Sequence, residues 1–313
     1  MGSLTSIERV AQRLDDERST RLHKEDVDFD GYMTQRDKDI AKIKGPEDFR
    51  EMVHQEFMGE AKLAGLLLPW SKMADKFRVR PGEVTIWTGF NGHKKSMVTG
   101  YVILSLIAQG AKAAIASFEM KPHKTLKRMC CQAIGTKEPT TKYIDKFLDK
   151  MTGSLWLYDQ QGEVTVDRII AVVYYCAEQL GITQFVIDSL MKVVANEDDY
   201  NGQKRFIDRL CAAARELNVH IHLVHHSRKR DDEKTRPGKQ DSKGSGAIVD
   251  QTDNFVVVFC PPKKEGEVDK PDVLLYVDKQ RHGDYEGVCP LWFDDRSLQF
   301  REGSSVPRKL WVD

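Results

Sequence analysis

From Phe77 onward, short apolar runs alternate with longer stretches of helical periodicity. The runs at 84–87, 113–116, 185–187 and 221–224 have the length and composition of buried strands. Strands that alternate with helices predict an α/β fold with a mostly parallel central sheet. Later runs at 255–259, 273–277 and 291–293 follow one another with turn residues between them, and they predict further strands toward one side of that sheet.

The first sixty residues have a different pattern. They are charged and rather acidic, with apolar residues at helical spacing at two places, and a polar middle at 25–39 that resembles a linker. The apolar positions are Ile7, Val10 and Leu14, then Phe49, Met52, Val53 and Phe57. This predicts a helical N-terminal arm at 1–60, either a solvated linker or an arm that docks on another subunit. We assign one α/β domain to 61–303 and a C-terminal tail to 304–313.

Composition narrows the class of protein. The chain has 313 residues, 40% of them hydrophobic, which suits one large domain and an appended segment. Lysine plus arginine and aspartate plus glutamate both total 48, so any site for a polyanion must be local. We find no run of about eighteen apolar residues and no signal sequence, and expect a cytoplasmic protein without a membrane partner. The six cysteines form no C-x-x-C pair, so no zinc site is indicated.

A phosphate loop is the strongest local motif. Residues 89–96 read G-F-N-G-H-K-K-S, between a predicted strand and a predicted helix, which is the context that the G-x-x-x-x-G-K-[ST] pattern requires. Backbone amides and the helix N-terminus would hold phosphates, Lys95 would reach the β- and γ-phosphates, and Ser96 would bind Mg²⁺. The residues expected to bind the nucleotide are Gly89, Asn91, Gly92, His93, Lys94, Lys95 and Ser96.

Lys94 departs from this pattern because it occupies the position of the second glycine. If the position needs a positive φ, a side chain there costs about 1–2 kcal/mol, which a tightly packed loop tolerates. Two interpretations remain open: Lys94 strains the loop, or it is an additional cation for the phosphates. The substitution also leaves open whether hydrolysis is weakened.

Three further candidates lie at predicted strand ends. Glu119 lies just past the strand that ends at 117–118 and could orient an attacking water, although an acid before a helix N-terminus is the local alternative. Asp188 ends the run 184–188, as an aspartate that holds Mg²⁺ does. His226 follows the strand at 219–224 and could contact a γ-phosphate. The pair His225–His226 is not expected to bind metal, because adjacent strand residues point to opposite faces.

Together, these segments resemble the replicative helicase family that includes bacterial DnaB, phage primase-helicases and mitochondrial Twinkle. The resemblance extends over about 77–300 and rests on G-F-N-G-H-K-K-S, S-F-E-M at 117–120, F-V-I-D-S at 185–189, L-V-H-H-S-R-K at 223–229, K-G-S-G-A-I-V-D-Q-T-D at 243–253 and D-K-Q-R-H-G at 278–283. It implies a RecA-like P-loop NTPase core. It also implies a DNA helicase that uses ATP, or another NTP or dNTP, with Mg²⁺.

The resemblance also implies roles for single residues. Glu119 would be the catalytic carboxylate, Asp188 the Mg²⁺ aspartate and His226 the γ-phosphate sensor, at a position where DnaB has glutamine. Lys279 and Arg281 match a lysine-x-arginine pair that reaches the ATP of the neighbouring subunit, and their spacing on a strand puts both on one face. A solvated edge strand is the alternative for this pair. The family's usual state is a homo-hexameric ring.

DNA is expected to bind to polar loops. The loop at 227–243 has an excess of basic residues, although a solvated loop is the alternative, and a second polar stretch lies at 195–205. Ser245 and the glycine after it match the family's DNA-contacting motif. The expected DNA contacts are Lys204, Arg205, Arg228, Lys229, Arg230, Lys243, Ser245 and Gly246. Both loops lack interleaved aromatic residues, so binding that follows the DNA backbone is expected.

Single-stranded DNA at a replication fork is therefore the expected substrate, with a primase, polymerase or loader as further partners. The sequence contains no primase region and no room for the helical collar domain of DnaB, so an excised domain or a compact, phage-encoded helicase is expected. Two other functions remain open. One is a RecA- or RadA-type recombination ATPase, and the other is a weakly active or inactive DNA-binding, helicase-like subunit.

Overall fold

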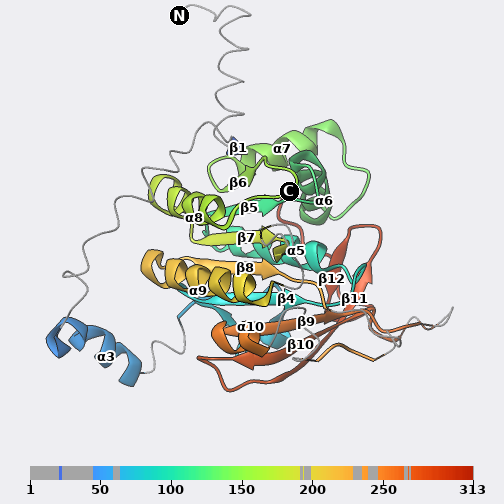
Figure 1. Ribbon diagram of the computed structural model, residues 1–313. Coiled ribbons are helices and arrows are strands. Elements are labelled where there is room, and N and C mark those ends of the chain that lie inside the picture. The colour runs from blue at the N-terminus through green and yellow to red at the C-terminus, as the bar shows by residue number, and fades with distance from the viewer. Residues whose placement is uncertain are drawn as a thin grey trace, which may run out of the picture.

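A large, mostly parallel β-sheet with helices on both faces forms the body of the protein (Figure 1). The computed structural model describes residues 21–22, 45–58, 64–190, 193, 199–227, 235–238, 246–263, 267 and 269–312. In this part of the chain the sheet has ten strands, in the order β1-β6-β5-β7-β8-β4-β9-β10-β11-β12. The α/β fold with a mostly parallel sheet, predicted from the apolar runs, is confirmed.

The strands divide into a parallel and an antiparallel part. The parallel part contains β1 (Arg21–Leu22), β6 (Leu155–Tyr158), β5 (Ala113–Ser117), β7 (Gln184–Asp188), β8 (His220–Val224), β4 (Val84–Thr88) and β9 (Asn254–Phe259). The antiparallel part contains β10 (Val273–Gln280), β11 (Gly287–Asp294) and β12 (Gln299–Arg301). A separate pair is formed by β2 (Leu66–Leu67) and β3 (Arg78–Val79). The late apolar runs therefore extend the sheet on one side, as predicted.

Two hydrophobic cores lie on opposite faces of the sheet. One face packs against α5 (Lys95–Ala108), α6 (Pro122–Ile134) and α7 (Thr141–Met151), and the other against α8 (Val166–Leu180), α9 (Tyr200–Leu217) and α10 (Gly246–Gln251). Alternate residues of β5 serve the two cores: Ala113 and Ile115 face the first, Ala114 and Ala116 the second. Burial on both faces explains why the parallel strands are continuous apolar runs without alternation.

Three features at the periphery of the domain were not predicted from the sequence. β6, with the short sequence L-W-L-Y, was not predicted, and residues 21–22 of the expected helical arm form a strand beside it. The described part of the tail, 304–312, packs on the domain, because Trp311 N–H donates to the Ala133 carbonyl at 2.9 Å and Val312 is buried. Among the described helices, none is long and apolar enough to cross a membrane.

Within the domain, a 3₁₀ helix, η4 (Ser71–Met73), precedes β3. In the described part of the arm, another short 3₁₀ helix, η3 (Pro46–Phe49), leads into α3 (Arg50–Phe57). The apolar side chains of this segment are exposed, and Phe57 is 90% exposed. The earlier positions Ile7, Val10 and Leu14 lie outside the described residues. An amphipathic helix with an uncovered apolar side fits the docking-arm interpretation, which stays a prediction.

Candidate active site

The carboxyl ends of four neighbouring strands are level with one another. The residues that stand side by side in register at this edge are Ser117, Asp188, Val224 and Trp87. Glu119, His226 and Gly89 each follow two residues beyond this row, after β5, β8 and β4. The sheet topology therefore brings residues from distant parts of the sequence to one edge, where α/β proteins bind ligands.

The phosphate loop connects β4 to α5 and closely approaches β9. A Cβ on Gly89 would lie 2.2 Å from the Val258 carbonyl oxygen, so the first glycine is required by that contact. Gly92 and Lys94 both have positive φ, 81° and 61°. Lys94 is the N-cap of α5 and adopts the left-handed conformation. A glycine would adopt this conformation at no steric cost.

Lys95 is buried inside the loop. Its Nζ donates hydrogen bonds to the carbonyl oxygens of Gly89 at 2.9 Å and of Phe90 at 2.8 Å. Burial lowers the pKa of Lys95 to about 8, an effect that the nearby carboxylates of Asp188 and Glu119 oppose. The ammonium is thus held between loop carbonyls and two acids, in a position to exchange the carbonyls for phosphate oxygens.

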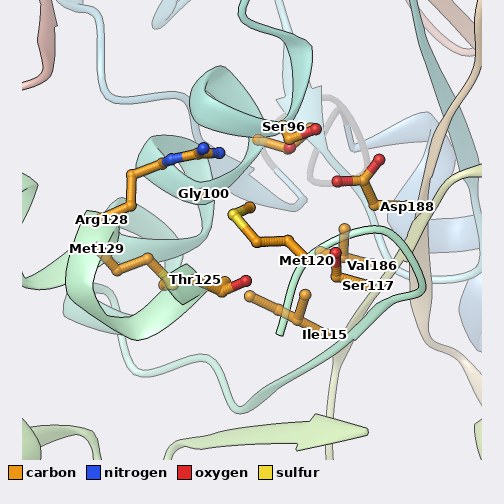
Figure 2. A pocket seen from close by; sticks show the side chains of 11 residues that line it. Ser96, Gly100, Ile115, Ser117, Met120, Thr125, Arg128, Met129, Val186 and Asp188 are labelled. Carbon is orange, nitrogen blue, oxygen red and sulfur yellow. The ribbon is translucent and has the colours of Figure 1, made fainter. Parts of the chain in front are cut away.

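Ser96 and Asp188 are the candidate ligands for a divalent ion. Both line one pocket at the N-terminus of α5 (Figure 2). Burial raises the pKa of Asp188, whereas its hydrogen bond with the Ser96 side chain lowers it and the neighbouring Glu119 raises it further. A hydroxyl and a carboxylate are hard oxygen donors of the kind that Mg²⁺ prefers, so the donor set fits that ion.

Glu119 and His226 lie next to each other at the same edge. The Ser189 hydroxyl donates to Glu119 Oε1 at 3.1 Å, and His226 Nε2 lies 3.7 Å from the same oxygen. A carboxylate and an imidazole held this close to Lys95 and Asp188 can orient a water and sense a phosphate. The structure thus groups the residues of the expected catalytic set that come from β5, β7 and β8.

Two residues of the loop have their side chains engaged elsewhere. His93 Nδ1 accepts a hydrogen bond from the Cys260 N–H at 3.1 Å, and its ring packs against Phe90 and Phe259. The Lys94 ammonium lies 4.3 Å from the ring centroid of Phe293, on β11. These contacts tie the loop to β9 and β11, while Asn91 and Gly92 are exposed at its tip.

Lys279 and Arg281 lie near the amino ends of the parallel strands, whereas the phosphate loop lies at their carboxyl ends. β10 runs antiparallel to β9 and pairs Gln280 with Asn254, at the start of β9, whereas the loop follows the carboxyl end of β4. Lys279 Nζ donates to three carbonyl oxygens at the end of α10, those of Val249, Asp250 and Thr252. Arg281 donates to the carbonyls of Asp250 and Gln251. The fold therefore keeps both cations away from the site on their own chain.

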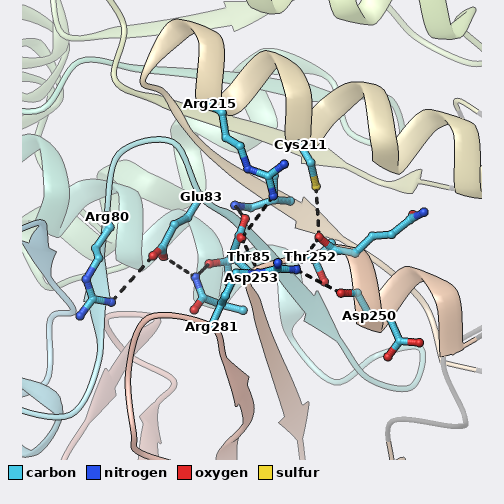
Figure 3. A network of polar contacts seen from close by, with 12 residues as sticks. Arg80, Glu83, Thr85, Cys211, Arg215, Asp250, Thr252, Asp253 and Arg281 are labelled. Atoms are coloured by element: carbon cyan, nitrogen blue, oxygen red, sulfur yellow. Dashed lines mark hydrogen bonds and ion pairs between the residues drawn. The ribbon is translucent and has the colours of Figure 1, made fainter. Parts of the chain in front are cut away.

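A buried acid, Asp253, connects Arg281 to β4 and to Arg215 (Figure 3). It is 2% exposed, accepts a hydrogen bond from the Val84 N–H at 2.9 Å, and lies 3.0 Å from Arg281 Nε and 3.6 Å from Arg215. Burial raises the pKa of Glu83, beside it, to about 7. Asp253 ends the motif at 243–253, but its role is not predictable from the sequence because nothing local signals its partners.

The structure describes only some of the residues that are expected to bind DNA. Lys204 and Arg205 are exposed near the N-terminus of α9, and Gly246 begins α10. The remaining candidates lie outside the described residues: Arg228, Lys229, Arg230, Lys243 and Ser245. Of the long basic loop, the piece at 235–238 is anchored to β10, because Arg236 donates two hydrogen bonds to the Asp278 carboxylate at 2.8 and 2.7 Å.

Comparisons with known proteins agree with this architecture. The model of a family described as "AAA domain" matches residues 74–232. Two solved structures have a similar fold. One is described as the structure of a DnaB-like replicative helicase and its interactions with primase (TM-score 0.68, 16% identity, 83% of this chain and 67% of that chain). The other is described as an ATPase domain (TM-score 0.69, 16% identity, 83% of this chain and 99% of that one). The RecA-like fold expected from the motifs is thereby confirmed.

Proposed function

We propose that the chain, which belongs to the AAA domain family, is an ATP-dependent replicative DNA helicase. It acts as a homo-hexameric ring that moves on single-stranded DNA and hydrolyses ATP, or another NTP or dNTP, at its subunit interfaces. The observation that carries this proposal is the division of the catalytic set between the two edges of one sheet.

One edge supplies the half-site that binds and attacks the nucleotide. Lys95 binds the β- and γ-phosphates, and Ser96 and Asp188 hold Mg²⁺, which neutralises phosphate charge when bound. Glu119 orients the attacking water and accepts its proton, and His226 hydrogen-bonds the γ-phosphate. Support comes from the contacts among these side chains, which converge although their positions are separated by up to about 130 residues.

The other edge supplies the half-site of the next subunit. Lys279 and Arg281 lie at the far end of the strands from their own phosphate loop, which supports a role at a neighbouring subunit's nucleotide. Their charge stabilises the phosphoryl-transfer transition state only when the neighbour is docked. A head-to-tail contact of this kind closes into a ring when the rotation between subunits allows it. The exposed apolar side chains of α3 support a docking role for the arm.

DNA and further partners complete the proposal. Gly246 belongs to the segment that resembles a DNA-contacting motif, and Lys204 and Arg205 present exposed charge for phosphates. Primase is a candidate partner because one protein of similar fold is described with its interactions with primase. A loader and a polymerase are proposed on the family resemblance alone.

The test measures ATP hydrolysis with and without single-stranded DNA, together with ATP-dependent separation of a forked duplex. Lys95→Ala should abolish both activities, because the β- and γ-phosphates lose their cation. Glu119→Gln should retain ATP binding and lose hydrolysis by on the order of 10³-fold or more. Lys270→Ala and Glu267→Gln are matched controls, because these two residues form an exposed ion pair at 2.7 Å and should leave both activities unchanged.

Other outcomes point to other functions. Filaments in place of rings by electron microscopy, with strand exchange in place of duplex separation, would favour the recombination ATPase. DNA binding without ATP binding or hydrolysis would favour the helicase-like subunit. Turnover of Glu119→Gln equal to that of the wild type would remove Glu119 from the mechanism.

A further inference from the structure

A small cavity lies between α5, α6 and the ends of β5 and β7, beside the proposed metal ligands. Its volume is about 20 Å³, and Ser96 and Asp188 form part of its wall (Figure 2). A cavity needs roughly 10–15 Å³ to hold one water molecule, and the water also needs two to four polar partners. The available space therefore admits a single water, provided that the wall is polar.

Two buried hydroxyls in this wall lack partners. Ser117 is 6% exposed and Thr125 is 9% exposed. Their side-chain oxygens, Oγ and Oγ1, have no hydrogen-bond partner among the described residues. A buried hydroxyl left unsatisfied is costly, and in native proteins such groups are bonded to protein or to ordered water. Two of them facing one water-sized space indicate a bound water.

A third hydroxyl in the same wall does have a hydrogen-bond partner, so among the described residues of this wall the lack of one is particular to Ser117 and Thr125. Thr99 is 2% exposed and also lines the cavity, but its Oγ1 donates to the Lys95 carbonyl oxygen at 3.1 Å. Its hydrogen-bonding capacity is used within α5. The unsatisfied groups therefore lie on the β5 and α6 side of the cavity.

Charged groups complete the wall. Arg128, from α6, is half-buried and extends toward the pocket in Figure 2. Burial lowers the pKa of its guanidinium, and the charge of Asp188 opposes that effect. Within the described residues, Arg128 makes no hydrogen bond or ion pair that would hold it elsewhere. Arg128, Ser117 and Thr125 thus supply hydrogen-bond donors to the wall of the small cavity that the carboxylate of Asp188 also lines.

We propose that this cavity holds one ordered water that bridges Ser117 and Thr125 to Asp188, and that both hydroxyls are positioning residues for the divalent ion of the nucleotide site. This inference rests on the proposed function. The water would fix the orientation of the Asp188 carboxylate, and partners of a metal ligand outside the coordination sphere commonly change metal affinity about 10–100-fold.

The test uses the full chain, a non-hydrolysable triphosphate analogue and Mn²⁺ as the probe, with free Mn²⁺ measured by electron paramagnetic resonance. Thr125→Val, which keeps the side-chain shape and removes the hydroxyl, should raise the Mn²⁺ Kd roughly tenfold, and so should Ser117→Ala. Affinity for the analogue without metal should stay unchanged. Thr99→Val is the matched control, because the same change in the same wall removes a hydroxyl already bonded to its own helix.

A crystal structure of the metal-free chain gives a second readout. We expect density for one water within hydrogen-bond distance of Thr125 Oγ1 and Ser117 Oγ, lost in Thr125→Val. An empty wild-type cavity overturns the inference, as does unchanged Mn²⁺ affinity in both variants. Equal losses in Thr125→Val and Thr99→Val also overturn it, because packing then explains them. These results are distinct from a failure of the proposed function, which would appear as absent DNA-stimulated hydrolysis.

Discussion

At residue 94 a lysine takes a backbone conformation that suits glycine. The left-handed φ of 61° costs a residue with a Cβ about 1–2 kcal/mol, whereas the contact of its ammonium with the Phe293 ring returns about 0.5–1 kcal/mol. The strain is therefore only partly offset. Because the side chain is directed to β11, the interpretation of Lys94 as a strained loop residue gains support over that of an additional phosphate cation.

Two substitutions at this position separate strain from charge. Lys94→Ala loses the cation and keeps the strain, and Lys94→Gly loses both. Lys94→Gly should therefore be more stable than Lys94→Ala by about 1–2 kcal/mol in denaturant unfolding. It should also bind triphosphate at least as tightly as the wild type, because closer approach of backbone amides favours bound phosphates.

Asn218 offers a control away from the loop, because it has a φ of 55° at the end of α9. Asn218→Gly should likewise be more stable than Asn218→Ala, and neither variant should change nucleotide binding. If Lys94→Gly instead weakens triphosphate binding, and does so together with Lys94→Ala, the ammonium serves the phosphates and the strain interpretation is wrong.

At the scale of elements, the junction between α10 and β9 positions the two cations that we propose for the second half-site. Asp253 joins β4 through the Val84 N–H and holds Arg281 at 3.0 Å. Asp253→Asn keeps an oxygen that accepts from Val84 and removes the charge that orients the guanidinium. We expect DNA-stimulated turnover to fall on the order of 10- to 100-fold, because small misplacements of a catalytic group have such effects.

Nucleotide binding by Asp253→Asn should be unchanged, because the phosphate loop is at the other edge of the sheet. The matched control is Asp294→Asn, which removes another poorly exposed carboxylate paired with an arginine, Arg308. It should lower stability without lowering turnover in assays below the unfolding temperature. Equal turnover in Asp253→Asn and the wild type would show that Arg281 is oriented by the helix carbonyls alone.

At the scale of the whole molecule, the proposed division of the site into two half-sites predicts complementation between subunits. Chains with Lys95→Ala lack one half-site, and chains with Arg281→Ala lack the other. Mixed and allowed to assemble, they should regain part of the ATP hydrolysis, because some interfaces then combine the two intact halves. Each variant alone should stay inactive, and the measurement is DNA-stimulated turnover against mixing ratio.

A mixture of Lys95→Ala with Asp188→Asn provides the control, because both changes affect the same half-site and no interface between those chains is complete. Recovery in this control would mean that the site is not divided between subunits. Full activity of Arg281→Ala as a demonstrated monomer would have the same meaning.

The sequence alone determined the fold class, and it also predicted the residues of the proposed nucleotide half-site. Apolar runs such as 84–87 and 185–187 are local signals of buried strands, and the phosphate loop is a continuous segment whose chemistry is evident from its order. Because the carboxyl ends of the strands in a parallel sheet share one edge, the sequence predicts that Glu119, Asp188 and His226 lie close together.

Only the tertiary structure decided which groups face one another across elements. The partners of Asp253, the cavity beside Asp188 and the contact of Lys94 with Phe293 all join residues far apart in the chain. The strand β6 was missed for a related reason, because four apolar residues become a strand only when a neighbouring strand such as β5 pairs with them. Side-chain contacts between elements depend on register and packing, which no local pattern of residues encodes.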